Sequence, residues 1–243
     1  MNLYDCIIFV AHPDDAFLGM GGTLYKLSLF SNVLLVCASN GENGNNLQGK
    51  DRLEELNKSS KLFSIDFISL ELTDGELIYN QQKLYLLFLD ILKRNNPKYI
   101  YTHHPNDKHN DHVAVYRSCI TAIDSLWHHH KTNTLLSHTF CFTPIHIDFC
   151  DLKKLDYNTF YDISDCIKQK EEALKYHISQ MPYIEKNMSK HLALSKFLGV
   201  LCGCEFVEAF YECRSENVKS LDSLLGKDDM LETIRKELDC SSL

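Results

Sequence analysis

The pattern of hydrophobic positions predicts alternating strands and helices over the first 130 residues. Short apolar runs, rich in β-branched and aromatic residues, predict buried strands at residues 7–10, 33–38, 67–70 and 99–102. Between them, apolar residues recur at helical spacing and predict helices over residues 21–30, 51–63, 82–93 and 113–127. Strands that are apolar throughout and alternate with helices require a parallel sheet covered on both faces. We therefore predict an α/β, Rossmann-like fold with a mostly parallel sheet.

The remainder of the chain continues this pattern less regularly. It predicts a strand at residues 139–142, a helix at 165–180, a late strand at 205–211 and a terminal helix at 229–238. We see no internal repeat and no low-complexity linker, so we expect a single domain over residues 1–243.

Two clusters of histidine and aspartate each follow a predicted strand. The first is His12-Pro13-Asp14-Asp15, and the second runs from His103 to His112. Ligands of an open parallel sheet bind beyond the carboxyl ends of its strands, so the fold would bring these clusters together in an active site there. His12, Asp15 and His112 could then offer two imidazoles and one carboxylate to a divalent metal, with one position open for water. Zinc accepts this mixture, although iron(II) uses the same ligand types.

A further carboxylate lies beside these candidate ligands. A metal ion lowers the pKa of bound water and makes it a nucleophile, provided that a neighbouring group accepts the proton. Asp14 is adjacent to Asp15 and is available for that role.

The two clusters resemble the motifs of the PIG-L/LmbE-like zinc-dependent N-deacetylases. Ala11-His12-Pro13-Asp14-Asp15 is similar to the opening motif of that family, and His109-Asn110-Asp111-His112 is similar to its second motif. Weaker likenesses extend the resemblance over nearly the whole chain, at residues 51–55, 72–77, 177–180 and 208–210. One departure is Ala16, where many members carry glutamate.

The resemblance implies a role for each matching position. It implies that His12, Asp15 and His112 bind zinc and that Asp14 is the general base. It further implies that His109 stabilises the oxyanion or protonates the leaving amine, that Asp111 orients the His109 imidazole, and that Arg52 contacts substrate. Asp107, which precedes His109, is an additional candidate for contact with substrate.

The reaction implied is the hydrolysis of an acetamide on a small amino sugar or sugar conjugate. Two alternatives stay open. A metal-dependent phosphoesterase commonly uses two metals and more carboxylates, so a metal count near two per chain would favour it. A Rossmann-like module that binds a nucleotide sugar without catalysis would release no acetate.

Composition narrows the class of partner. The formal net charge of -8 argues against a nucleic-acid-binding protein, and no apolar run approaches the length of a membrane span. The first residues lack the features of a signal peptide, so we expect a cytoplasmic protein whose 10 cysteines are reduced thiols. The expected partner is a small N-acetylated sugar; assembly into a homo-oligomer stays open.

Overall fold

The computed structural model describes residues 3–43, 49–129, 138–146 and 155–214. They form one seven-stranded sheet in the order β3-β2-β1-β4-β5-β7-β6. The first five strands in this order pair in parallel, whereas β7 is antiparallel to both of its neighbours. The predicted α/β fold with a mostly parallel sheet is confirmed. The strands are β1 (Cys6–Val10), β2 (Val33–Ser39), β3 (Asp66–Leu72), β4 (Tyr99–Thr102), β5 (His138–Phe142), β6 (Thr159–Asp162) and β7 (Val207–Arg214).

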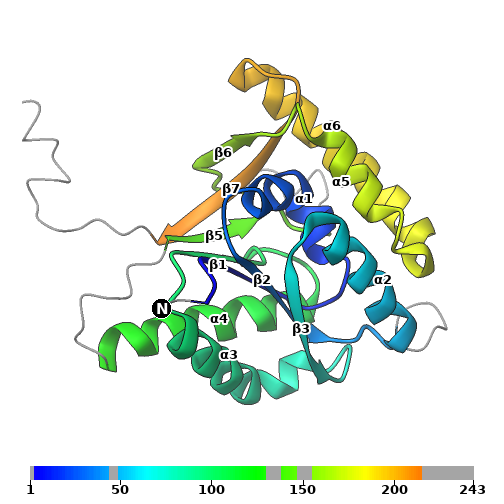
Figure 1. Ribbon diagram of the computed structural model, residues 1–243. Coiled ribbons are helices and arrows are strands. Elements are labelled where there is room, and N and C mark those ends of the chain that lie inside the picture. The colour runs from blue at the N-terminus through cyan, green and yellow to red at the C-terminus, as the bar shows by residue number, and fades with distance from the viewer. Residues whose placement is uncertain (1–2, 44–48, 130–137, 147–154, 215–243) are drawn as a thin grey trace, which may run out of the picture.

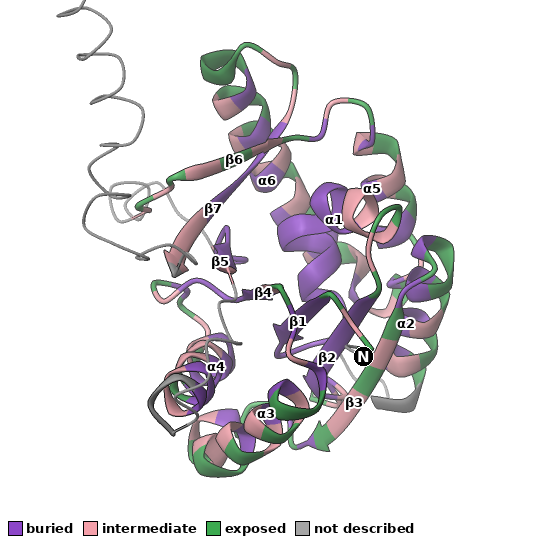
Figure 2. Cartoon of the chain, turned by 60° about the vertical axis from the view of Figure 1, so that its left-hand side comes forward, coloured by how far each residue is buried: buried purple, intermediate pink, exposed green. Residues whose placement is uncertain are grey.

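Helices cover both faces of the sheet, as Figure 1 shows. They are α1 (Asp15–Ser28), α2 (Gly49–Phe63), α3 (Gln81–Asn95), α4 (Asn110–His129), α5 (Ile167–Leu174) and α6 (Met181–Cys202). Successive residues of β1 enter opposite hydrophobic layers, because side chains alternate along a strand. Ile8 packs in the layer that holds residues of α1, α2, α5 and α6, and Ile7 packs in the layer of α3 and α4. Figure 2 shows the resulting burial of β1, β2 and α1.

Two helices begin three or more residues earlier than the sequence pattern predicts. α1 begins at Asp15 rather than at residue 21, and Gly19, Gly21 and Gly22 lie inside it, around a kink at Met20. These glycines allow close packing: a Cβ on Gly19 would lie 2.5 Å from the ring of Phe142. α4 begins at Asn110 instead of residue 113, which places His112 in its first turn.

The C-terminal third differs most from the prediction. The helix predicted over residues 165–180 ends at Leu174, a 3-10 turn follows at Ile178–Gln180, and α6 was not predicted. Pro182 lies in the first turn of α6, where its fixed φ favours helix initiation. The edge strand β6 was also missed, because it has only four residues and none of them is fully buried. The predicted terminal helix at residues 229–238 lies outside the described residues.

Two further observations concern composition. Among the described helices, none is long and apolar enough to cross a bilayer. The cysteines that the structure describes are all free thiols.

The order of the strands determines where a ligand can bind. The chain runs outward from β1 through β2 to β3, and then returns to place β4 on the other side of β1. The loops that leave β1 and β4 therefore diverge, and such a switch point opens a crevice at the carboxyl edge of the sheet. Both predicted histidine clusters leave the sheet at this point.

Candidate metal centre

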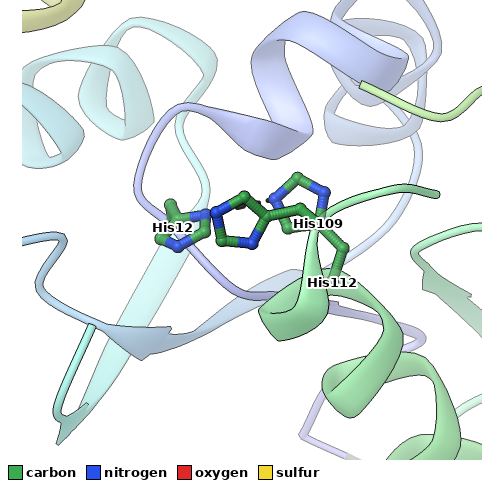
Figure 3. A group of neighbouring side chains, drawn as sticks. All are labelled: His12, His109 and His112. Carbon is green, nitrogen blue, oxygen red and sulfur yellow. Dashed lines mark hydrogen bonds between the residues drawn. The ribbon is translucent and has the colours of Figure 1, made fainter. Parts of the chain in front are cut away.

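The loop after β1 and the first turn of α4 bring three side chains into contact. His12 Nδ1 lies 3.2 Å from His112 Nε2. One oxygen of Asp15 is 3.3 Å from His12 Nδ1, and the other is 3.4 Å from His112 Nε2. Ligand atoms bound tetrahedrally at about 2.0–2.1 Å are separated by roughly 3.3 Å, so this triangle has the dimensions of a metal site. Figure 3 shows how the rings of His12, His109 and His112 gather between the two segments.

A second carboxylate contacts the far nitrogen of each of these imidazoles. Asp74 Oδ1 is 3.0 Å from His12 Nε2, and Asp107 Oδ2 is 3.0 Å from His112 Nδ1. Carboxylates in this position fix the tautomer and the ring orientation of histidines that bind metal. Asp107 was expected to touch substrate, but its side chain lies behind His112, where it also accepts a hydrogen bond from the amide of Ile145 (2.8 Å).

Asp111 lies on the same side of His12 as Asp74. One of its oxygens is 3.6 Å from His12 Nε2, and the two oxygens accept hydrogen bonds from the amides of Gly75 (2.7 Å) and Leu77 (3.0 Å). Asp111 thus ties the turn after β3 to the start of α4. Its side chain faces His12 and this turn, while its own amide donates a hydrogen bond to His109 Nδ1 (3.2 Å).

The charge of the cluster favours a cation. Burial alone would lower the pKa of His112, but Asp15 and Asp107 outweigh it and raise the pKa to about 9. His103 stacks on the His112 ring, and its pKa shifts in the other direction. Burial and the neighbouring His112 lower the pKa of His103 to about 4. Buried carboxylates therefore outnumber the positive charges that the protein itself supplies, and this is the environment in which a divalent ion binds.

His109 offers an alternative third ligand. One ring nitrogen each from His12, His109 and His112 lie within 4.8 Å of one another. Burial and the neighbouring imidazoles of His112 and His12 lower the pKa of His109 to about 4, which keeps its ring neutral. Because Nδ1 accepts the hydrogen of the Asp111 amide, the hydrogen of the neutral ring resides on Nε2.

Arg52 holds the carboxylate of Asp14 at the edge of the triangle. Its Nη2 lies 2.7 Å from Asp14 Oδ1, and its Nη1 donates to the carbonyl of Gly41 at 3.0 Å. Gly41 has a φ of +65°, and a Cβ at this position would overlap the Arg52 guanidinium. Glycine is therefore required here for two reasons, one conformational and one steric.

These residues surround a cavity of about 280 Å³. Six of the predicted site residues line it, whereas Asp107 and Asp111 lie behind the histidines that they contact. The cavity is lined by His12, Asp14, Asp15, Asn43, Arg52, Asp74, Gly75, His109, His112, His146, Gln180 and Tyr183.

Several lining residues were not predicted. Asp74 and Gln180 fall within short segments that resemble family motifs, so a signal for them existed. Gln180 reaches the cavity because Glu55 on α2 accepts hydrogen bonds from the amide (2.8 Å) and the hydroxyl (2.6 Å) of Ser179. His146 and Tyr183 had no motif around them, and only the tertiary structure brings them to the site.

Known proteins are similar to this chain in sequence. Residues 7–123 match the model of the PIG-L family, described as GlcNAc-PI de-N-acetylase. The uncharacterized deacetylase YaiS of Escherichia coli is 30% identical over 122 residues, which is 46% of this chain and 64% of YaiS. The diacetylchitobiose deacetylase of Thermococcus kodakarensis is 25% identical over 188 residues, covering 70% of this chain and 68% of that protein. The chain thus spans slightly less than two thirds of YaiS.

The fold has a counterpart among solved structures. The conserved protein TT1542 from Thermus thermophilus superimposes with a TM-score of 0.71 at 22% identity, covering 87% of this chain and 95% of TT1542. This likeness shows a shared fold. The chain thus shares its fold with TT1542, and residues 7–123, slightly less than half of the chain, are similar to the PIG-L family.

Proposed function

We propose that the chain is a zinc-dependent hydrolase that removes the acetyl group from the N-acetylated amine of a small amino sugar or sugar conjugate. The observation that carries this proposal is the triangle of His12, Asp15 and His112 beside Asp14, all facing one cavity. The names of the two curated relatives, both deacetylases, support the choice of an acetamide. A cavity of about 280 Å³ is near the small end of ligand sites, which favours one sugar ring at the reacting centre.

The donor set fits zinc. Two imidazoles and one carboxylate with an open position are the ligands of many catalytic zinc sites, and such an ion supplies Lewis acidity toward the amide carbonyl and a lowered pKa for bound water. His12, Asp15 and His112 would hold it, and Asp74 and Asp107 would keep the two imidazoles in the orientation that binding requires.

Asp14 accepts the proton of the attacking water. Arg52 holds the carboxylate beside the triangle by its contact at 2.7 Å, in a position where it can act as a general base. The leaving amine needs one proton when the C–N bond breaks, and the proton taken up by Asp14 satisfies that need. Arg52 therefore acts in this proposal chiefly through Asp14.

His109 stabilises the charge that develops on the carbonyl oxygen. Its Nε2 carries the hydrogen of a neutral ring, so it donates a hydrogen bond to an oxyanion without first losing a proton. Asp111 contributes through its backbone amide, which determines the tautomer of His109.

Acetate release tests the proposed function directly. We expect the purified protein to form acetate and free amine in equal amounts from N-acetylglucosamine or its simple conjugates. A chelator should abolish the reaction and added Zn²⁺ should restore it, with close to one metal per chain. Hydrolysis of phosphate esters with two metals per chain, and no acetate from any N-acetylated sugar, would contradict the proposal.

Removing the charge of Asp74 or Asp107 is expected to weaken metal binding. In Asp74→Asn and Asp107→Asn the imidazole loses its carboxylate partner, and loss of such a partner typically costs about 10- to 100-fold in metal affinity. Competition with a chromophoric chelator measures the affinity. Asp66→Asn is the matched control, since Asp66 is exposed on β3 and hydrogen-bonds to Tyr4. Wild-type affinity in both site variants would show that these carboxylates do not orient the ligands.

A further inference from the structure

Two aromatic side chains from outside the family-matched segment form part of the cavity wall. Tyr183 lies in the first turn of α6, and His146 lies four residues beyond the end of β5. A hydrogen bond of 3.1 Å links Tyr183 Oη to His146 Nε2, and the ring centroids are 5.7 Å apart. Both residues line the same cavity as Asp14 and His109. We refer to them as the Tyr183–His146 pair.

Hydrogen bonds to the backbone fix the position of this pair. The carboxylate of Asp107 accepts the amide hydrogen of Ile145, next to His146, at 2.8 Å. On the other side, the side-chain amide of Asn187 donates to the carbonyl of Tyr183 at 3.0 Å. A pair anchored at both backbones loses little conformational entropy when it binds a ligand.

The pair lies beside the reacting centre. The ring of His146 stacks on that of His109 at 5.4 Å between centroids and 22° between planes. One ligand atom each from His146, His112 and Asp107 lie within 4.8 Å of one another. A sugar whose acetamide reaches His109 and the metal triangle would therefore place its ring close to Tyr183.

The residues that the sequence predicts to contact substrate already have partners within the protein. Arg52 contacts Asp14 and the Gly41 carbonyl, and Asp107 contacts His112. The hydroxyl of Tyr183, in contrast, keeps hydrogen-bonding capacity. If it donates to His146, its lone pairs can accept a hydrogen; if it accepts from His146, its own hydrogen is available. Burial raises the pKa of Tyr183 well above its usual value, so the phenol keeps that hydrogen.

We propose that the Tyr183–His146 pair hydrogen-bonds to a ring hydroxyl of the sugar that carries the acetamide and so determines which amino sugar is accepted. This inference rests on the proposed function, because it takes the acetamide at the metal triangle as the fixed point. It assigns sugar recognition to the C-terminal part of the chain.

Tyr183→Phe tests the pair, since it removes one oxygen and leaves the ring. The substrates are N-acetylglucosamine, its 3-, 4- and 6-deoxy analogues, and the acyclic amide N-acetylethanolamine. With N-acetylglucosamine we expect KM to rise about tenfold or more and kcat to change little, because the contacted sugar hydroxyl loses its partner in the half-buried cavity wall. The analogue that lacks the contacted hydroxyl, and the acyclic amide, should be hydrolysed equally by both proteins. Tyr79→Phe, at a position 85% exposed and outside the cavity, should match wild type throughout.

A second measurement does not depend on turnover. Calorimetry should show weaker binding of N-acetylglucosamine to Tyr183→Phe and to His146→Ala. The double variant should lose no more binding free energy than the two single variants lose together. The wild-type protein could bind the sugar more tightly than Tyr183→Phe and yet release no acetate. That result would refute the proposed function but would still support sugar binding by the Tyr183–His146 pair. The pair is overturned if Tyr183→Phe binds and hydrolyses N-acetylglucosamine like wild type, or if it loses the same factor on every substrate, including the acyclic amide.

Discussion

Asp14→Asn is expected to lower kcat for acetamide hydrolysis by roughly 10²- to 10⁴-fold while the metal content stays at the wild-type level. Asparagine has the shape of aspartate but cannot take the proton of the attacking water. Asp14 lies beside the triangle and contacts Arg52 at 2.7 Å, so its substitution leaves the His12, Asp15 and His112 contacts in place. Single-turnover rates and the metal-to-protein ratio, measured on the same preparation, check both parts.

The control for this variant is Asp51→Asn. Asp51 is exposed in the first turn of α2, next to Arg52 in sequence, and lies outside the cavity. We expect its rate to equal that of wild type. If Asp14→Asn retained full activity, another group would be the base; if it lost the metal, Asp14 would be a ligand.

Asp15→Asn and His112→Ala are expected to lower metal affinity by about 100-fold or more, whereas His109→Ala should retain the metal and lose activity. A structural zinc site at neutral pH is worth on the order of 10 kcal/mol, so the loss of one of three ligands removes a large share of it. Asp15 is separated from both histidine nitrogens by 3.3–3.4 Å, which is the spacing of a shared ion. Competition with a chelator of known affinity gives the dissociation constants.

The opposite result would identify a different centre. Release of the metal from His109→Ala together with its retention in Asp15→Asn would point to the three-histidine set of His12, His109 and His112. Asp15 would then serve to hold the loop after β1, through the hydrogen bond that it accepts from the amide of His12 (2.7 Å).

Much of the fold could be predicted from local pattern, because the central strands are short and wholly apolar. β1 and β2 are buried along their entire length, and β3 and β4 also appear where apolar runs predict them. Helix starts were harder to locate. The start of α1 was missed because Gly21 and Gly22 look like a helix boundary, although they actually make room for α5 and for Ile163.

The site, too, has one part that sequence motifs indicate and another part that depends on the tertiary structure. The contact between the predicted ligands could be anticipated because His12 and Asp15 are three residues apart after β1, and His112 follows β4, the strand paired with β1. The position of Asp107 behind His112 depends on the path of the loop before α4, which residue type alone does not determine. Tyr183 meets His146 across 37 positions of sequence, and no periodicity or motif predicts such a contact.

The crossover between β1 and β4 has a consequence for how related enzymes diverge. Both loops that bear the metal triangle emerge from adjacent, hydrogen-bonded strands at the centre of the sheet, whereas His146 follows β5 and Tyr183 lies on α6, later in the chain. In the function that we propose, mutations that accumulate after β5 would therefore alter sugar preference while the residues assigned to hydrolysis are inherited unchanged. Under such an arrangement, the accepted substrate can change while the residues of the metal triangle and Asp14 stay the same.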